Sequence, residues 1–176
     1  MSQLKVNSIV PINGLPSGAS GGIIQTVQTV KTDTTSTYST TMVDCSGMAV
    51  TITPSSSSNK ILVTVIANVG AASGYRAMFR ILRGSTAIGI GTDVSNRQAC
   101  GMSSRYHDNG VTHNAVQTFL DSPATTSATT YSVRIGGSKN GTTNYFVNRP
   151  YQWSDDNRRA TGISTLTLME VSAWVH

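Results

Sequence analysis

The segment Lys60-Ile-Leu-Val-Thr-Val-Ile-Ala-Asn-Val69 decides the fold of this chain. Side chains of a β-strand alternate between its two faces, and in this segment both faces are largely apolar. One face carries Ile61, Val63, Val65, Ala67 and Val69, and the other carries Leu62 and Ile66. The β-branched residues, with a Ser-rich stretch before them and a Gly-rich stretch after them, favour a strand over a buried helix. A strand that is apolar on both faces belongs between two covering layers, either at the centre of a sandwich or at a subunit interface.

The composition of the 176 residues points to a single all-β domain with a short appendage. Only 12% of the residues are charged, and Glu170 is the only glutamate. Amphipathic helices need Glu, Lys, Ala and Leu on their solvent faces, so this chain has little material for helices. Thr, Val, Ile and Tyr are frequent instead, and these residues suit the pleated surface of a strand. We therefore predict an all-β fold.

From Ile23 onward, alternating apolar runs are separated by turn signals. They predict strands at 23–31, 37–44, 48–54, 60–69, 75–83, 86–91, 115–121, 129–136, 143–148 and 162–171. Eight to ten short strands with regular turns are typical of an antiparallel β-sandwich, and we predict a jelly-roll-like one. Two segments, 92–113 and 149–161, are longer than such a fold needs, and long loops are usually either functional or disordered.

Residues 1–22 differ from the rest of the chain. The segment Leu4-Lys-Val-Asn-Ser-Ile-Val10 predicts a short strand, and the Pro- and Gly-rich residues that follow it predict an extended arm. The apolar residues available for anchoring this arm are Leu4, Val6, Ile9 and Val10. Because such an arm buries too little to hold itself in place, we expect a neighbouring subunit or a larger assembly to hold it. The chain thus divides into an anchoring arm, 1–22, and a β-sandwich domain, 23–176.

Charge and cysteine content argue against several classes of protein. The net charge is +5, but the arginines are scattered and no nucleic-acid-binding motif accompanies them, so we expect no direct nucleic-acid binding. No apolar stretch is long enough to span a bilayer, and the first residues lack the pattern of a secretory signal. We therefore expect that the protein is synthesised in a cytoplasm and that it does not insert into a membrane. Cys45 and Cys100 lack the spacing of a disulfide framework or a zinc site, and we interpret them as small apolar side chains.

The first long segment contains Arg105, Tyr106 and His107, which we single out as candidates for surface recognition. His107, Asp108 and His113 are types of residue that bind Zn²⁺ or Fe. Their spacing matches no established motif, so a polar surface loop is the simpler interpretation. Three copies of a histidine meeting on the axis of a trimer would still permit a metal site.

The second long segment places two aromatic residues among charged ones. The candidate recognition residues here are Tyr151, Trp153, Asp155, Asp156, Arg158 and Arg159. Aromatic rings beside carboxylates and guanidinium groups suit sugar binding, because the ring covers an apolar sugar face while the charged groups bind hydroxyls. Tyr, Trp and Arg are equally the usual anchors of protein interfaces. A plain solvated loop is the third interpretation.

Residues for catalysis do not combine into a recognisable site. Glycosidases need paired carboxylates, and Asp155 and Asp156 are neighbours whose side chains point apart in an extended segment. Glu170 lies in an apolar strand, where we expect it to pair with a buried arginine. No serine sits in a nucleophile elbow and no Gly-rich phosphate loop precedes a helix. We expect neither enzymatic activity nor a cofactor.

Three segments resemble tailed-bacteriophage virion proteins of the tail-fibre type. Leu4-Lys-Val-Asn-Ser-Ile-Val10 with its Gly-rich sequel resembles their N-terminal segment. Ile23-Ile-Gln together with Val50-Thr-Ile-Thr-Pro-Ser-Ser-Ser-Ser-Asn-Lys-Ile-Leu-Val63 is similar to the start of their β-rich modules, and Ser164-Thr-Leu-Thr-Leu-Met-Glu-Val171 to their final strand. The middle of the chain, with both long segments, carries no such likeness. The resemblance implies a trimeric virion appendage with a jelly-roll or C1q-like head, assembled in the cytoplasm of a host bacterium.

Hydrophobic patterning agrees with self-association. The segments 60–69 and 163–171 both read as apolar on two faces, which is more hydrophobic surface than one small sandwich needs, and closed symmetric assembly is the usual remedy. Our leading expectation is a homotrimeric tail-fibre or spike subunit. Its arm would bind other virion proteins and its long loops would contact a host glycan or receptor. The alternatives are a capsid decoration or head-fibre protein and a carbohydrate-binding module that uses Tyr151 and Trp153.

Overall fold

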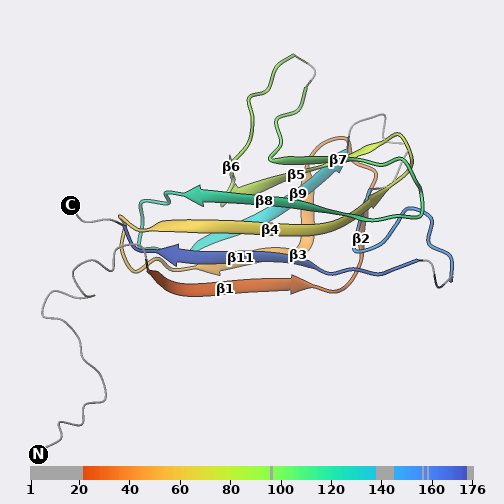
Figure 1. The fold of residues 1–176 in the computed structure, drawn as a ribbon. Coiled ribbons are helices and arrows are strands. Elements are labelled where there is room, and N and C mark those ends of the chain that lie inside the picture. The colour runs from red at the N-terminus through yellow and green to blue at the C-terminus, as the bar shows by residue number, and fades with distance from the viewer. Residues whose placement is uncertain (1–21, 96, 138–144, 156, 158, 174–176) are drawn as a thin grey trace, which may run out of the picture.

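Two antiparallel β-sheets pack face to face (Figure 1). The structure, a computed structural model, describes residues 22–95, 97–137, 145–155, 157 and 159–173. Its strands are β1 (Ile23–Lys31), β2 (Thr35–Thr37), β3 (Val43–Ile52), β4 (Lys60–Ala71), β5 (Arg76–Arg83), β6 (Thr86–Ile88), β7 (Met102–Arg105), β8 (His113–Asp121), β9 (Thr129–Gly137), β10 (Tyr145–Val147) and β11 (Ser164–Val171). None of the described residues forms a helix long and apolar enough to cross a membrane. The predicted all-β fold is confirmed.

The order of the strands is that of a jelly roll. One sheet, called sheet A here, runs β1-β11-β4-β10-β2, with β8 on the other edge of β4. The second, sheet B, runs β3-β9-β5-β6, with β7 also paired to β5. When the three-residue strands β2, β6 and β10 are left aside, sheet A has the order β1-β11-β4-β8 and sheet B has the order β3-β9-β5-β7. Two interlocked Greek keys give this order, and the predicted jelly-roll-like sandwich is confirmed.

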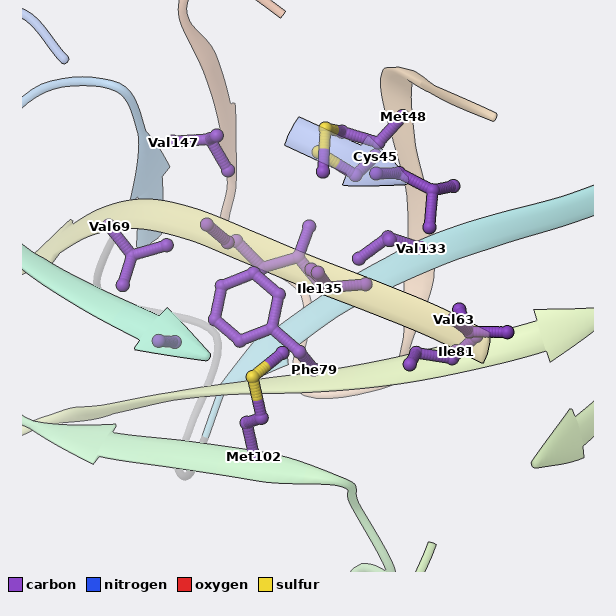
Figure 2. Packing of buried hydrophobic residues seen from close by; sticks show 14 of the residues in the cluster. Cys45, Met48, Val63, Val69, Phe79, Ile81, Met102, Val133, Ile135 and Val147 are labelled. Atoms are coloured by element: carbon purple, nitrogen blue, oxygen red, sulfur yellow. The ribbon is translucent and has the colours of Figure 1, made fainter. Parts of the chain in front are cut away.

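The core lies between the sheets. The inward residues of β4, among them Ile61, Val63 and Val65, are fully buried against the inward residues of β5 and β9. Figure 2 shows Phe79 of β5 beside its cross-strand partner Met102 of β7, below the β4 ribbon. Full burial of an aliphatic or aromatic side chain contributes about 1.5–3 kcal/mol. This layer therefore supplies most of the driving force for folding.

Among the described residues, no layer covers the outward face of β4 around Leu62 and Ile66. Leu62 is only partly buried and Ile66 is 39% exposed. Of the two positions predicted for a doubly apolar strand, the centre of a sandwich with both faces covered is therefore wrong for this chain alone. The other predicted position of this strand, at a subunit interface, stays a prediction.

Several strand boundaries differ from the prediction, and two segments differ most. Residues 37–44 do not form one strand: β2 ends at Thr37, and β3 begins at Val43. Between them, the backbone N–H groups of Ser39 and Thr41 bond to the hydroxyls of Thr37 and Ser39, and such local bonds compete with a sheet ladder. The segment 92–113 is also not a continuous loop, because β7 lies inside it. One of the four residues of β7 is buried, which leaves hardly any alternation to detect in the sequence.

The last strand, β11, was predicted to be apolar on both faces, but each of its faces also carries polar residues. Its inward residues are Ser164, Leu166, Leu168 and Glu170, and its outward ones include Thr165 and Thr167. Glu170 is fully buried, and the partner predicted for it is wrong: it accepts hydrogen bonds from Gln25, Ser55 and Asn59, and no arginine among the described residues bonds to it. Neutral donors on β1 and on the loop before β4 therefore satisfy this carboxylate.

The sandwich has two chemically different ends (Figure 1). At the end called the terminal end, Ile23 pairs with Val171, and Gly22 accepts a hydrogen bond from Ser172. At the opposite end, called the loop end, β4 pairs with the start of β8 and with β10, and the loops 106–112 and 148–163 emerge there. Gly22 is the only residue of the predicted arm that the structure describes; Leu4, Val6, Ile9 and Val10 lie outside the described residues. Cys45 is packed in the core, Cys100 is partly buried, and both thiols are free.

Candidate functional site at the loop end

Two loops distant in sequence meet at the loop end. One is 106–112, between β7 and β8, and the other is 148–163, between β10 and β11. The N–H of Gln152 donates to the carbonyl oxygen of Asn109 at 2.7 Å, and the guanidinium of Arg159 donates to Oε1 of Gln152 at 3.2 Å. The same guanidinium lies directly against the Cα of Gly110, where no room is left for a Cβ. The loops therefore form one surface.

Asn148 fixes the base of the second loop. Its backbone has a left-handed φ of 67°, a conformation that Asn adopts more readily than most residues. Its buried amide nitrogen donates to the carbonyl oxygens of Lys31 (2.9 Å) and Asp33 (2.8 Å), and its amide oxygen accepts from the hydroxyl of Ser164 (2.6 Å). One side chain thus joins the end of β1, the end of β10 and the start of β11.

An arginine between two aromatic rings forms the outer part of this surface. The guanidinium carbon of Arg149 lies 3.8 Å from the ring centroid of Phe146 and 4.5 Å from that of Trp153. Tyr151 meets Phe146 edge to face at 5.9 Å between centroids. Desolvation lowers the pKa of Arg149, but an arginine side chain stays charged at neutral pH. Cation–π contacts of this kind contribute about 0.5–2 kcal/mol each and hold Trp153 in place.

Two shallow hollows flank the stack. The larger, of about 400 Å³, is lined by Trp153, Ser154, Asp155, Arg159 and Thr161. The smaller, of about 220 Å³, is lined by Gly110, Val111, Thr112, Pro150 and Ala160. Both lie on loop residues, and the larger one combines an aromatic ring with a carboxylate and a guanidinium group.

The candidates predicted in the second loop are only partly brought together. Tyr151 and Trp153 are 41% and 53% exposed, and Trp153 shares the larger hollow with Asp155 and Arg159. Asp156 and Arg158 lie outside the described residues.

None of the candidates predicted in the first loop lines the hollow beside Trp153. Tyr106 is fully buried, so its assignment to surface recognition is wrong: its ring packs edge to face on His113 at 5.1 Å and its backbone pairs with Tyr75. Arg105 is exposed but lies on the outer face of sheet B, opposite Arg76. His107 is exposed, and its carbonyl oxygen accepts a bond from the hydroxyl of Ser73.

The same segment contains the three residues predicted as possible metal ligands. Within the described part of the chain, His107, Asp108 and His113 do not gather into a group of three or more potential ligands. The contact of His113 with Tyr106 gives that histidine a packing role instead.

Sequence reasoning missed the two residues that support Trp153. Arg149 and Phe146 carry the stack. Phe146 stands in the three-residue strand β10, whose residues are all apolar and all buried, so no alternation of polar and apolar residues shows that its side chain points outward. The spacing Phe146-x-x-Arg149-x-Tyr151-x-Trp153 is the only signal present, and it has meaning only once β10 is placed.

The loop end offers the chemical groups that recognition surfaces use. A half-exposed indole ring held over a guanidinium, beside a carboxylate and a second guanidinium, offers an apolar plate with hydrogen-bonding groups at its rim. No protein-family model matches the chain, and no curated protein matches it significantly. The geometry and the residues therefore carry the functional argument.

Proposed function

We propose that the protein is a structural subunit of a phage virion: a homotrimeric tail-fibre or spike subunit, anchored through residues 1–22 to other virion proteins. Its loop end would face a glycan or receptor on the host surface. The resemblance of the N-terminal segment, the first strands and the last strand to such proteins motivates the proposal.

The observation that best supports this proposal is the polarity of the sandwich. The described chain begins at Gly22 and returns at Ser172 on the terminal end, where these two residues are hydrogen-bonded. The loops between β7 and β8 and between β10 and β11 lie at the opposite end (Figure 1), and the second of them contains Tyr151 and Trp153. A subunit held by its arm at one end would present the aromatic surface at the other, which is the arrangement that attachment requires.

Deleting residues 2–22 tests the anchoring role. We expect phage particles that encode the shortened chain to lack the protein, as measured by immunoblotting of purified particles. Thermal unfolding of the purified shortened chain should stay cooperative, which separates loss of anchoring from loss of folding. Normal amounts of the folded, shortened protein on particles would contradict the proposal.

Replacing Trp153 by alanine tests the recognition role. Because an aromatic anchor of an interface typically contributes 2 kcal/mol or more, we expect binding of the purified chain to host cells to weaken by at least about tenfold. Tyr38→Ala is the matched control, since Tyr38 is an aromatic side chain of similar exposure outside both loops. Equal binding by the two variants would remove Trp153 from the recognition surface.

A carbohydrate-binding module is the second candidate function, and the hollow beside Trp153 favours it. Competition by free sugars distinguishes a glycan from a protein receptor in the same binding assay. Unchanged sugar binding by the chain without residues 2–22, together with absence of the protein from any particle, would favour the module. A capsid location would place the same subunit on heads, and immunogold labelling of intact particles separates heads from tails.

A further inference from the structure

The outer face of sheet A is free of charge. It is defined here by the outward residues of four strands: Ile24, Thr26, Gln28 and Val30 of β1; Thr165, Thr167, Met169 and Val171 of β11; Leu62, Thr64, Ile66 and Asn68 of β4; Asn114, Val116, Thr118 and Leu120 of β8. Lys60 stands at the border of this face, and its Nζ turns aside to the hydroxyl of Ser122 at 2.7 Å. No charged side chain interrupts the sixteen positions beyond it.

The apolar residues of this face lie in rows across the strands. Leu62 pairs with Leu120 on one side and with Met169 on the other. Ile66 pairs with Val116, and the row continues through β11 to Val30. A row of threonines separates the two. Val116, Leu120 and Val30 are about half exposed, at 56%, 53% and 48%. Exposed apolar area that is contiguous in this way marks an interaction site on soluble proteins.

The polar side chains of this face bond to one another. Gln28 donates to the hydroxyl of Thr167 at 2.7 Å, and the hydroxyls of Thr64 and Thr118 are 3.5 Å apart. The amide of Asn68 donates to the amide oxygen of Asn114 at 2.9 Å. Covering the face would break none of these three bonds, which lowers the cost of desolvation, although Oδ1 of Asn68 is already buried without a partner.

The outer face of sheet B shows what this chain places against water. Its outward positions include Asp44, Arg76, Arg80, Arg105 and Arg134, and Arg134 pairs with Asp44 at 2.7 Å. The two outer faces of one sandwich thus differ completely in charge. Solvation alone does not explain that difference, because both sheets are outer layers of the same domain.

The chain already covers one end of the outer face of sheet A. Pro150 and the carbonyl of Arg149 lie on Gly70 of β4, so closely that a Cβ would not fit there. Beside them, Phe146 points away from the core and is covered by Arg149 and Tyr151. Nothing in the part of the chain that the structure describes covers the rest of the face in this way.

We propose that copies of this chain cover the outer face of sheet A, so that this face is the subunit interface. The chain carries a net charge of +5, which opposes association most strongly where charged side chains come close together, and this face brings none of them together. Uncharged rows of Leu, Ile, Val and Met can pack against other copies of the same face. A two-fold contact joins one such face to itself, and three such faces turned toward a common axis close the proposed trimer. Four strands spaced about 4.8 Å apart, with about eight residues each at 3.3 Å, give roughly 500 Å² of flat area per copy. Two such faces reach the roughly 1,000 Å² that a specific interface needs.

This inference deepens the proposed function, because it names the surface through which the subunits associate. Its evidence is the face itself, so the two can fail separately. An oligomer that depends on this face but never enters a particle would leave the interface standing and refute the virion role. A chain with a disrupted face that stays oligomeric and still enters particles would refute the interface and leave the virion role standing.

Sedimentation of the full chain at about 10 μM tests the interface. We expect the native chain to sediment as an oligomer and Val116→Lys as a monomer. Ser103→Lys is the matched control: it adds the same charge on the outer face of sheet B, and we expect it to stay oligomeric. Val116→Thr covers the case in which the lysine prevents folding, since it keeps the β-branched shape at an exposed position, and we expect its self-association to weaken at least tenfold. A monomeric native chain at 100 μM, or a folded Val116→Lys that stays oligomeric, would overturn the proposal.

Discussion

Replacing Asn148 by alanine is expected to lower the free energy of unfolding by about 4 kcal/mol. The change removes three buried side-chain hydrogen bonds, each with a net contribution of about 1 kcal/mol. It also places alanine at a φ of 67°, which costs an L-residue other than Asn or Gly roughly 1 kcal/mol more. Urea unfolding followed by tryptophan fluorescence or circular dichroism measures the difference.

Two further variants separate these causes. Asn148→Gly loses the same hydrogen bonds but tolerates the left-handed backbone, so we expect it to be destabilised less than Asn148→Ala. Ser103→Ala, at an exposed position of β7, should change stability by no more than about 0.5 kcal/mol. If Asn148→Ala unfolds at the native urea concentration, the side chain does not hold the three strand ends together.

Asn148 also connects stability to the proposed recognition surface. It directly precedes Arg149, whose guanidinium carries Trp153, and its backbone carbonyl accepts a bond from Gly162 at the far end of the same loop. A variant that loosens this position should therefore weaken host-cell binding even under conditions where the sandwich remains folded. The residues that present Trp153 are thus structural residues of the sandwich.

Much of the fold could be predicted from periodicity. The alternation of Ala77, Phe79 and Ile81 with their neighbours places β5, and Gly84 with a φ of 58° makes the turn to β6. The apolar run of β4 was the strongest signal and is indeed the strand between β11 and β8. These signals are local, because they depend only on which residues follow one another.

Features that depend on long-range contacts could not be predicted. β7 is recognised only by its ladder with β5, since Met102 is its sole buried residue. The donors to Glu170 come from residues more than a hundred positions away, and no spacing in the sequence reveals them. Tyr106 is buried because His113 and Tyr75 close around it, although its neighbours are polar.

The candidate site shows the same division. Tyr151 and Trp153 were identified because they are aromatic residues in a long, charged loop, and both are exposed. Their support by Phe146 and Arg149 follows from the position of β10 beside β4, which brings the start of the loop over Gly70. Local composition is enough to predict that Tyr151 and Trp153 are exposed. Which residues hold these two rings in place can be seen only in the three-dimensional fold.

Replacing Glu170 by glutamine is expected to remove a large part of the pH dependence of stability in acid. Burial by itself raises the pKa of Glu170, but hydrogen bonds from Gln25, Asn59 and Ser55 outweigh it and lower the pKa to about 2, from 4.5 in an unfolded chain. A carboxylate whose pKa is lower in the folded state stabilises the fold fully above the unfolded value. Its contribution is lost as the pH falls from about 4.5 to about 2. At pH 7 a shift of this size corresponds to about 3 kcal/mol.

Urea unfolding at several pH values measures this effect. We expect Glu170→Gln to be about 3 kcal/mol less stable than the native chain at pH 7, with the difference shrinking towards pH 2, because the native carboxylate is then protonated as well. Asp155→Asn, at an exposed carboxylate of the second loop, is the control and should track the native curve within about 0.5 kcal/mol. A constant difference between Glu170→Gln and the native chain over this range would mean that the charge of Glu170 is not what stabilises the fold. Gln25, one of its donors, stands three positions after Gly22, so the same network fixes the strand through which any pull on the arm reaches the sandwich.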